Sequence, residues 1–258
     1  MNDKLWSALA LVAFCGALAS ERHPNHVKAQ SSPIQIRALK PPANGVIHVA
    51  VLISEGTVVI DFAGPWEVFQ DTMFTSKGQA WKGGDDMIMP FDLYTVSDSD
   101  KPVSANGLMI VPNYTFANAP KPQVIVIPAQ SGRSDAQKKW LLENAKTADV
   151  TMSVCTGASM LAAYGFLDHQ KATTHHMSLD ELQKKYPNVE FVSGTRFVEN
   201  DKVATAAGLS SGIDLALHVV ERYYGRAIAQ ATADYMEYKG ELWRNPQYGE
   251  VKAVAAKN

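Results

Sequence analysis

Two near-continuous apolar runs constrain the fold of this chain more than any other feature. They lie at residues 46–53 and 124–127. Strands with apolar residues on both faces are typical of a parallel sheet that is covered by other elements on both sides. We therefore expect both runs to be central strands of such a sheet.

Strand-like and helix-like segments alternate along the rest of the chain. We expect helices at residues 64–72, 134–145, 156–164, 213–224 and 228–238, and further strands at 91–97, 150–154, 191–198 and 202–206. Residues 103–111 have the pattern of a hairpin. This alternation predicts an α/β fold with a mostly parallel central sheet and helices on both faces.

The N-terminal residues 1–29 have the features of a signal peptide. Lys4 precedes an apolar stretch, residues 5–19, that is too short to cross a bilayer comfortably. We expect cleavage near residue 19 or 29; the alternatives are a lipid anchor at Cys15 and an uncleaved anchor. The mature protein is then periplasmic or secreted, without stable membrane association. It has an irregular leader at 30–45, one domain at 46–240 and a C-terminal tail at 241–258.

Cys155 is the candidate nucleophile, and cleavage of the signal leaves it as the only cysteine. It follows the expected strand 150–154 directly, and ligands of such sheets bind beyond the carboxyl ends of the strands. The N–H groups that open the following helix favour a thiolate, which predicts a pKa below that of a free cysteine. The alternative is that Cys155 is a small buried hydrophobic residue.

Five segments, in order along the chain, resemble the ThiJ/PfpI superfamily of class I glutamine amidotransferase-like proteins, and most closely its isonitrile hydratase branch. They are residues 58–69, 112–116, 153–158, 172–175 and 205–218. The resemblance implies a flavodoxin-like three-layer sandwich with the cysteine on a nucleophile elbow. It also implies a homodimer. We expect no cofactor.

The resemblance assigns three residues to catalysis. Cys155 is the nucleophile, Thr156 is required beside it, and Asp61 transfers protons. From its local sequence alone, Asp61 is also a good N-cap for a helix that starts at Gly64-Pro65. Both interpretations of Asp61 therefore stand at this point.

His175 matches a family histidine, and a Cys155–His175 pair for hydrolysis is possible; the alternative is a polar histidine at the pocket edge or in the core. His176 stands where related sequences usually have tryptophan, and Ala129-Gln130 replaces a pair of glycines. The expected substrate-binding residues are Gly64, Ala129, Gln130, Gly157 and His176. We expect no metal, because adjacent histidines generally diverge and no Cys, Asp or Glu nearby completes a ligand set.

Ser210 lies in a G-x-S-x-G pattern, Gly208 to Gly212, of the kind that carries a serine nucleophile. The only later histidine, His218, belongs to the helix that Ser210 introduces, so it is poorly placed to act as a base. The other interpretation of this pattern is a simple helix start.

These features predict an exported cysteine enzyme that acts on a small molecule. A thiolate attacks the isonitrile carbon as a proton is delivered, and water then converts the thioimidate on Cys155 to an N-substituted formamide. The alternatives are a glyoxalase-like or cysteine hydrolase/peptidase activity, and a binding module without turnover. With 24 Lys and Arg against 26 Asp and Glu, and few residues after 240, we expect no nucleic-acid partner.

Overall fold

The computed structural model describes residues 37–244 and 252–253. The predicted signal peptide, 1–29, and the first part of the leader lie outside the described residues, so export and the cleavage site stay predictions. Residues 37–46 form no helix or strand, as expected for the leader. Among the helices of the described part, none is long and apolar enough to cross a membrane.

A seven-stranded sheet forms the centre of the domain, in the order β10-β11-β7-β6-β1-β2-β5. Its strands are β1 (Ile47–Leu52), β2 (Phe91–Ser97), β5 (Tyr114–Thr115), β6 (Val124–Ile127), β7 (Val150–Val154), β10 (Phe197–Asn200) and β11 (Val203–Ala206). Only β10 is antiparallel to its neighbour; the other pairs are parallel. The predicted mostly parallel sheet is confirmed.

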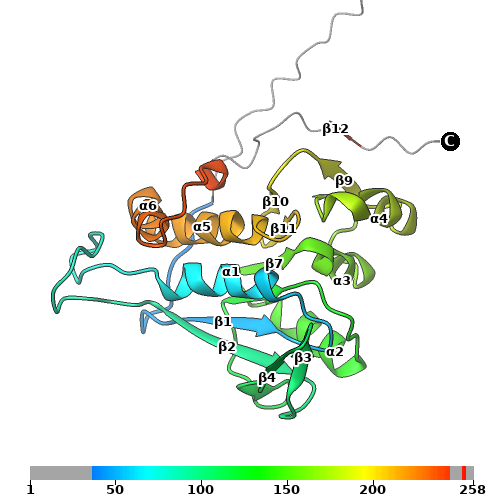
Figure 1. The fold of residues 1–258 in the computed structure, drawn as a ribbon, viewed down its shortest axis with the longest axis horizontal. Coiled ribbons are helices and arrows are strands. Elements are labelled where there is room, and N and C mark those ends of the chain that lie inside the picture. Colours follow the sequence, from blue (N-terminus) through cyan, green and yellow to red (C-terminus); the bar gives the residue numbers. More distant parts are fainter. Residues whose placement is uncertain (1–36, 245–251, 254–258) are drawn as a thin grey trace, which may run out of the picture. The chain divides into compact units, whose positions relative to one another are not determined.

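Helices cover both faces of this sheet (Figure 1). Strand β1 shows why, because its successive side chains point to opposite faces. Ile47, Val49 and Val51 pack in one cluster with residues of α1 (Val59–Gln70), α5 (Ser211–Tyr224) and α6 (Arg226–Tyr235). Ala50 and Leu52 pack in a second cluster with residues of α2 (Asp135–Asn144), α3 (Ala158–Ala163) and α4 (Leu179–Lys185). The result is a three-layer sandwich.

The remaining elements are short. They are the hairpin β3 (Val103–Ala105) and β4 (Leu108–Ile110), the small sheet of β8 (Lys171–Ala172), β9 (Glu190–Ser193) and β12 (Lys252–Ala253), and the 3₁₀ turns η1 (Cys155–Gly157), η2 (His176–Ser178) and η3 (Leu242–Arg244). Trp243 in η3 is fully buried in the first cluster. The packed domain therefore extends into the segment expected to be a tail.

Helix α1 begins five residues before the expected position, at Val59 rather than Gly64. Pro65 lies inside it, where proline normally costs stability because it has no N–H to donate. Pro65 packs closely on Gly212 of α5, because a Cβ added to Gly212 would lie only 3.2 Å from Cγ of Pro65. This packing offsets the loss. The Gly64-Pro65 pair therefore marks a helix contact and not a helix start.

The single strand expected at residues 191–198 is wrong. The chain forms β9 and β10 there, which belong to different sheets. Gly194, with a φ of 76°, separates them. This left-handed conformation suits glycine, and it redirects the chain between the two strands.

Candidate active site

Cys155 sits on a strained turn between β7 and α3. Its φ of 57° is uncommon for a residue with a side chain. Two hydrogen bonds hold this backbone: the Cys155 N–H donates to the carbonyl of Ala207 at 2.9 Å, and the Thr174 hydroxyl donates to the Cys155 carbonyl at 2.8 Å. The expected nucleophile elbow at the carboxyl end of a central strand is thereby confirmed.

Gly157 allows the elbow to lie directly on the end of β6. A Cβ at this position would be 2.2 Å from the carbonyl oxygen of Ile127 and 3.0 Å from that of Pro128. Real Cβ atoms do not approach backbone so closely, so any larger residue displaces η1. This contact gives Gly157 a structural reason to be present, and its role in substrate binding stays a prediction.

Asp61 meets the elbow from the first turn of α1 and is fully buried. Its carboxyl group interacts with the Cys155 thiol, and its Oδ2 accepts a hydrogen bond of 3.1 Å from the N–H of Ala129. Its Oδ1 has no conventional hydrogen-bond partner among the described residues. The N-cap interpretation of Asp61 is wrong, because Val58 occupies the cap position and Asp61 lies inside the helix.

Burial raises the pKa of Asp61 from its ordinary 3.8 to about 6. The cause is the loss of hydration around the carboxylate, which disfavours its charged form. The hydrogen bonds from Ala129 and from the thiol act in the opposite direction but are weaker. A carboxylate with this pKa is a better base than an exposed aspartate.

The pKa of the Cys155 thiol is raised, which contradicts the lowered value expected from the sequence. Burial is the largest cause, followed by the negative charge of Asp61. The N–H groups of Thr156 and Leu209 and the Thr156 hydroxyl favour the thiolate without overcoming these effects. Helix α3 has only six residues, so its dipole adds little. The thiol therefore needs a base before it attacks.

Leu209 was not singled out from the sequence, yet its backbone N–H lies against the sulfur. Its φ is 52°, so it shares the left-handed conformation of Cys155. The side chain of Leu209 gives no indication that its backbone N–H is a donor at the site. Ser210 next to it occupies the N-cap of α5 and accepts a hydrogen bond from Arg196. The G-x-S-x-G pattern is thus a helix start.

Ala129 and Gln130 follow β6, beside Asp61. The N–H of Ala129, one of the expected substrate-binding residues, donates its hydrogen bond to Asp61. The Gln130 Oε1 accepts a hydrogen bond of 2.7 Å from the Ser54 hydroxyl, whereas its Nε2 has no partner among the described residues. Ala129 therefore orients the carboxyl group, and the substrate-binding roles of both residues stay predictions.

His175 and His176 follow Thr174, whose hydroxyl group donates to the Cys155 carbonyl. The His175 Nδ1 accepts from the N–H of Met177 at 3.3 Å, and its ring lies against Gly208. The two imidazole rings are 4.4 Å apart, and His176 is exposed. No hydrogen bond or ion pair to Cys155 is found for either histidine within residues 37–244. Both catalytic and substrate-binding roles stay predictions.

Gly64, also expected to contact substrate, lies at the contact between α1 and α5. A Cβ there would be 2.9 Å from Cγ1 of Ile213. Helix packing is therefore sufficient to explain why this position is glycine, and its contact with substrate stays a prediction. No group of three or more His, Cys, Asp or Glu side chains suited to a metal ion occurs in the described part of the chain.

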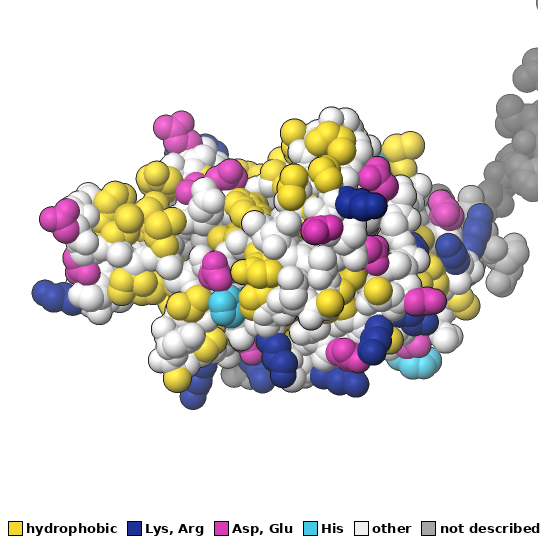
Figure 2. Space-filling view, turned by 90° about the horizontal axis from the view of Figure 1, so that it is seen from below, with side chains coloured by type: hydrophobic (Ala, Val, Ile, Leu, Met, Phe, Trp, Pro, Cys, Tyr) yellow, Lys and Arg dark blue, Asp and Glu magenta, His cyan; other side chains and the backbone are white. Residues whose placement is uncertain are grey.

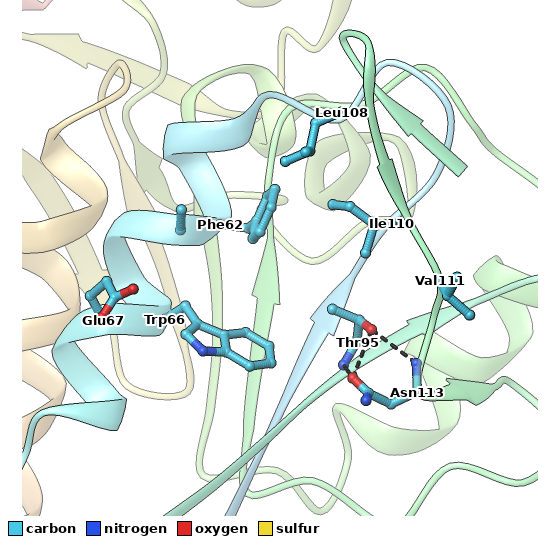
Figure 3. A pocket seen from close by; sticks show the side chains of 9 residues that line it. Phe62, Trp66, Glu67, Thr95, Leu108, Ile110, Val111 and Asn113 are labelled. Atoms are coloured by element: carbon cyan, nitrogen blue, oxygen red, sulfur yellow. Dashed lines mark hydrogen bonds between the residues drawn. The ribbon is translucent and has the colours of Figure 1, made fainter. Parts of the chain in front are cut away.

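A pocket of about 320 Å³ lies on another face of α1 (Figure 3). It is lined by Phe62, Ala63, Trp66, Glu67, Thr95, Leu108, Ile110, Val111 and Asn113. Aromatic rings from α1 face aliphatic side chains of the β3–β4 hairpin, and the hydrogen-bonded Thr95 and Asn113 lie at one side. Neither Cys155 nor Asp61 lines this pocket.

The fold and site define a class of protein: α/β sandwiches that carry a cysteine on an elbow with a buried carboxyl group beside it. Comparison with known proteins is consistent with this class. The model of the DJ-1/PfpI family matches residues 47–222, and the chain belongs to this family.

Relatives within the family differ in function. The chain is 27% identical to an isonitrile hydratase of Pseudomonas putida, over 74% of this chain and 78% of that protein. It is 27% identical to the HTH-type transcriptional regulator GbdR of Pseudomonas aeruginosa, but it spans only 40% of that regulator. The structure of a ThiJ/PfpI family protein from Pseudomonas syringae superposes with a TM-score of 0.63 at 22% identity, covering 87% of this chain and 85% of that one.

The buried carboxyl group makes a stability prediction. Because the folded state raises the pKa of Asp61 from 3.8 to about 6, the protein loses stability as pH rises through that window. Asp61→Asn removes the charge and keeps an oxygen for the Ala129 N–H. We expect its free energy of unfolding at pH 7 to exceed that of the parent by roughly 1 to 3 kcal/mol, measured by urea unfolding.

The difference should shrink at pH 4, where the parent carboxyl group is protonated in the folded state. Glu67→Gln, on the exposed side of the same helix, is the matched control and should change stability little at either pH. Equal or lower stability of Asp61→Asn at pH 7 contradicts the interpretation.

Proposed function

We propose that the chain is a cysteine-dependent hydro-lyase that hydrates an isonitrile to an N-substituted formamide. The observation that carries the proposal is the Cys155 thiol on its strained elbow in contact with the buried carboxyl group of Asp61. Similarity to the Pseudomonas putida isonitrile hydratase, over most of both chains, supports it.

The first step joins the thiol to the isonitrile. Asp61, as the carboxylate, accepts the thiol proton while the sulfur attacks the terminal carbon of the isonitrile. The same proton is then returned from Asp61 to the carbon, which leaves a carbon–nitrogen double bond and a thioimidate on Cys155. The hydroxyl and N–H of Thr156, which lie against the sulfur, stabilise negative charge there as the proton leaves.

The second step releases the product with water. Asp61 takes a proton from a water molecule as the water oxygen adds to the thioimidate carbon, and gives this proton to the nitrogen. The hydroxyl group of the adduct then loses its proton to the sulfur as the carbonyl forms and the carbon–sulfur bond breaks, and the N-substituted formamide leaves. A carboxyl group with a pKa of about 6 suits both directions of proton transfer near neutral pH.

The nucleophile is tested with a substrate panel on parent and variants. We expect Cys155→Ala to abolish hydration of cyclohexyl isocyanide, measured by chromatography of the formamide, because no other described residue supplies the thiolate. Cys155→Ser, which keeps a hydroxyl group, serves as the near-isosteric control and should also be inactive, since a hydroxyl is a far weaker nucleophile.

Hydration by Cys155→Ala at the parent rate overturns the assignment. Cysteine-dependent conversion of methylglyoxal to lactate, with no turnover of isonitriles, favours a glyoxalase-like enzyme instead. Stoichiometric binding of a metabolite without any turnover favours a binding module.

The proposed role of Asp61 predicts the pH dependence. Since Asp61 acts first in its carboxylate form, kcat/KM should rise as pH increases through about 6 and then level off. We expect Asp61→Asn to lose this limb and to be slower by about 100-fold or more. A rate that falls through pH 6 in the parent, or a limb retained in the variant, contradicts this role.

We also propose that two copies associate through the face around the β3–β4 hairpin. Leu108, Met109 and Val111 are 52%, 59% and 65% exposed, an unusual concentration of solvent-facing apolar side chains. They adjoin the apolar pocket against α1. Charges of both signs are interspersed over the face seen in Figure 2, with no single-sign region to keep copies apart.

Met109→Glu should shift the protein towards the monomer, because it buries a charge in the proposed contact. Met177→Glu is the matched control, since Met177 is 79% exposed and belongs to η2, which is not part of the hairpin. Sedimentation velocity of the parent and both variants measures the result. A monomeric parent, or a dimer that Met109→Glu leaves intact, excludes this interface.

A further inference from the structure

Arg196 contacts both ends of the segment that faces the elbow, residues 207–210. Its carbonyl accepts a hydrogen bond of 2.9 Å from the N–H of Ala207. Its guanidinium donates to the Ser210 hydroxyl at 3.1 Å and to Oδ2 of Asp214 at 2.6 Å. Arg196 thus binds the first residue of the 207–210 segment with its backbone and the last with its side chain.

The 207–210 segment is the one that meets Cys155. The Ala207 carbonyl accepts the Cys155 N–H at 2.9 Å, and β11 lies beside β7 with Ala206 opposite Val154. Leu209, with its φ of 52°, presents its N–H to the sulfur. A leucine does not adopt this conformation readily, so its neighbours must hold it there.

The buried Asp214 side chain holds the Arg196 guanidinium in place. Its side chain is 1% exposed, whereas that of Arg196 is 27% exposed. The Tyr238 hydroxyl donates to the same Oδ2 at 3.1 Å. Leaving the buried Asp214 carboxylate without a partner would cost free energy, so the ion pair keeps the Arg196 guanidinium in one position. The ion pair therefore fixes Arg196 to the first turn of α5, and the hydrogen bonds of Arg196 to Ala207 and Ser210 fix the 207–210 segment in turn.

We propose that Arg196 is a positioning residue which, through Asp214 and Ser210, fixes the Leu209 N–H beside the Cys155 sulfur. The donor then stabilises the thiolate at the moment when Asp61 removes the proton. The inference rests on the proposed function in taking Cys155 as the reacting group and Asp61 as its base.

The test uses iodoacetamide, which alkylates the thiolate and needs no isonitrile. Arg196→Gln combined with Asp214→Asn removes both charges and leaves two amides, so no buried charge is left unpaired. We expect alkylation of the Cys155 peptide, followed by mass spectrometry, to be about tenfold slower at pH 7. Its pH midpoint should move upward. For isonitrile turnover we expect kcat to fall and KM to change little.

Arg226→Gln, which breaks the ion pair between the exposed Arg226 and the largely buried Glu221, is the control and should keep the parent alkylation profile. A folded double variant with the parent alkylation profile overturns the proposal. If the double variant does not fold, Ser210→Ala removes only the Arg196–Ser210 hydrogen bond; it should slow alkylation in the same direction by a smaller factor, and an unchanged profile overturns the proposal.

The two proposals fail in different ways. A parent that hydrates no isonitrile, together with slowed alkylation in the double variant, rejects the proposed function and keeps the role of Arg196. Turnover in the parent, together with unchanged alkylation in the folded double variant, does the reverse.

Discussion

The left-handed backbone of Cys155 is the constraint on which the site depends. A residue held in this conformation costs on the order of 1 to 3 kcal/mol. Three segments that are distant in sequence hold the elbow. Ala207 accepts from the Cys155 N–H, Thr174 donates to the Cys155 carbonyl, and the carbonyl of Ile127 lies where a Cβ at Gly157 would clash. Ala207 and Ile127 lie at ends of strands in the central sheet, and Thr174 follows β8 of the small sheet. The elbow therefore exists only once both sheets have assembled.

Burial then couples the thiol to Asp61. Burial raises the pKa of both groups, and the charge of Asp61 raises that of the thiol further, whereas the hydrogen bond from the neutral thiol favours the Asp61 carboxylate. The pair therefore carries one negative charge more readily than two. A proton is therefore retained between sulfur and carboxylate and is available for transfer. The same burial makes Asp61 a source of instability at neutral pH, so the candidate site opposes folding.

The sequence predicts the parts of this structure that depend on side-chain pattern. Strands β1 and β6 are buried on both faces, and their apolar runs report this directly. The start of α1 was missed because Gly64-Pro65 is typical of a helix start, while its packing on α5 depends on distant residues. The Cys155 pKa was predicted in the wrong direction for a similar reason: its burial and the nearby Asp61 carboxylate arise from tertiary structure. The Leu209 donor is a backbone group, which no side-chain pattern marks.

The placement of donors also bears on the kind of electrophile. Acyl transfer needs donors aimed at a carbonyl oxygen that becomes negative. The Ala129 N–H is taken by Asp61, and the N–H groups of Thr156 and Leu209 lie against the sulfur. The donors are therefore concentrated on the Cys155 sulfur and on the Asp61 carboxyl group. The proposed addition to an isonitrile suits this distribution, because no carbonyl oxygen develops charge in its first step. Hydrolysis of an ester or amide would need donors for such an oxygen. The N–H of Thr156 or Leu209 would then have to leave the sulfur and bind the substrate oxygen.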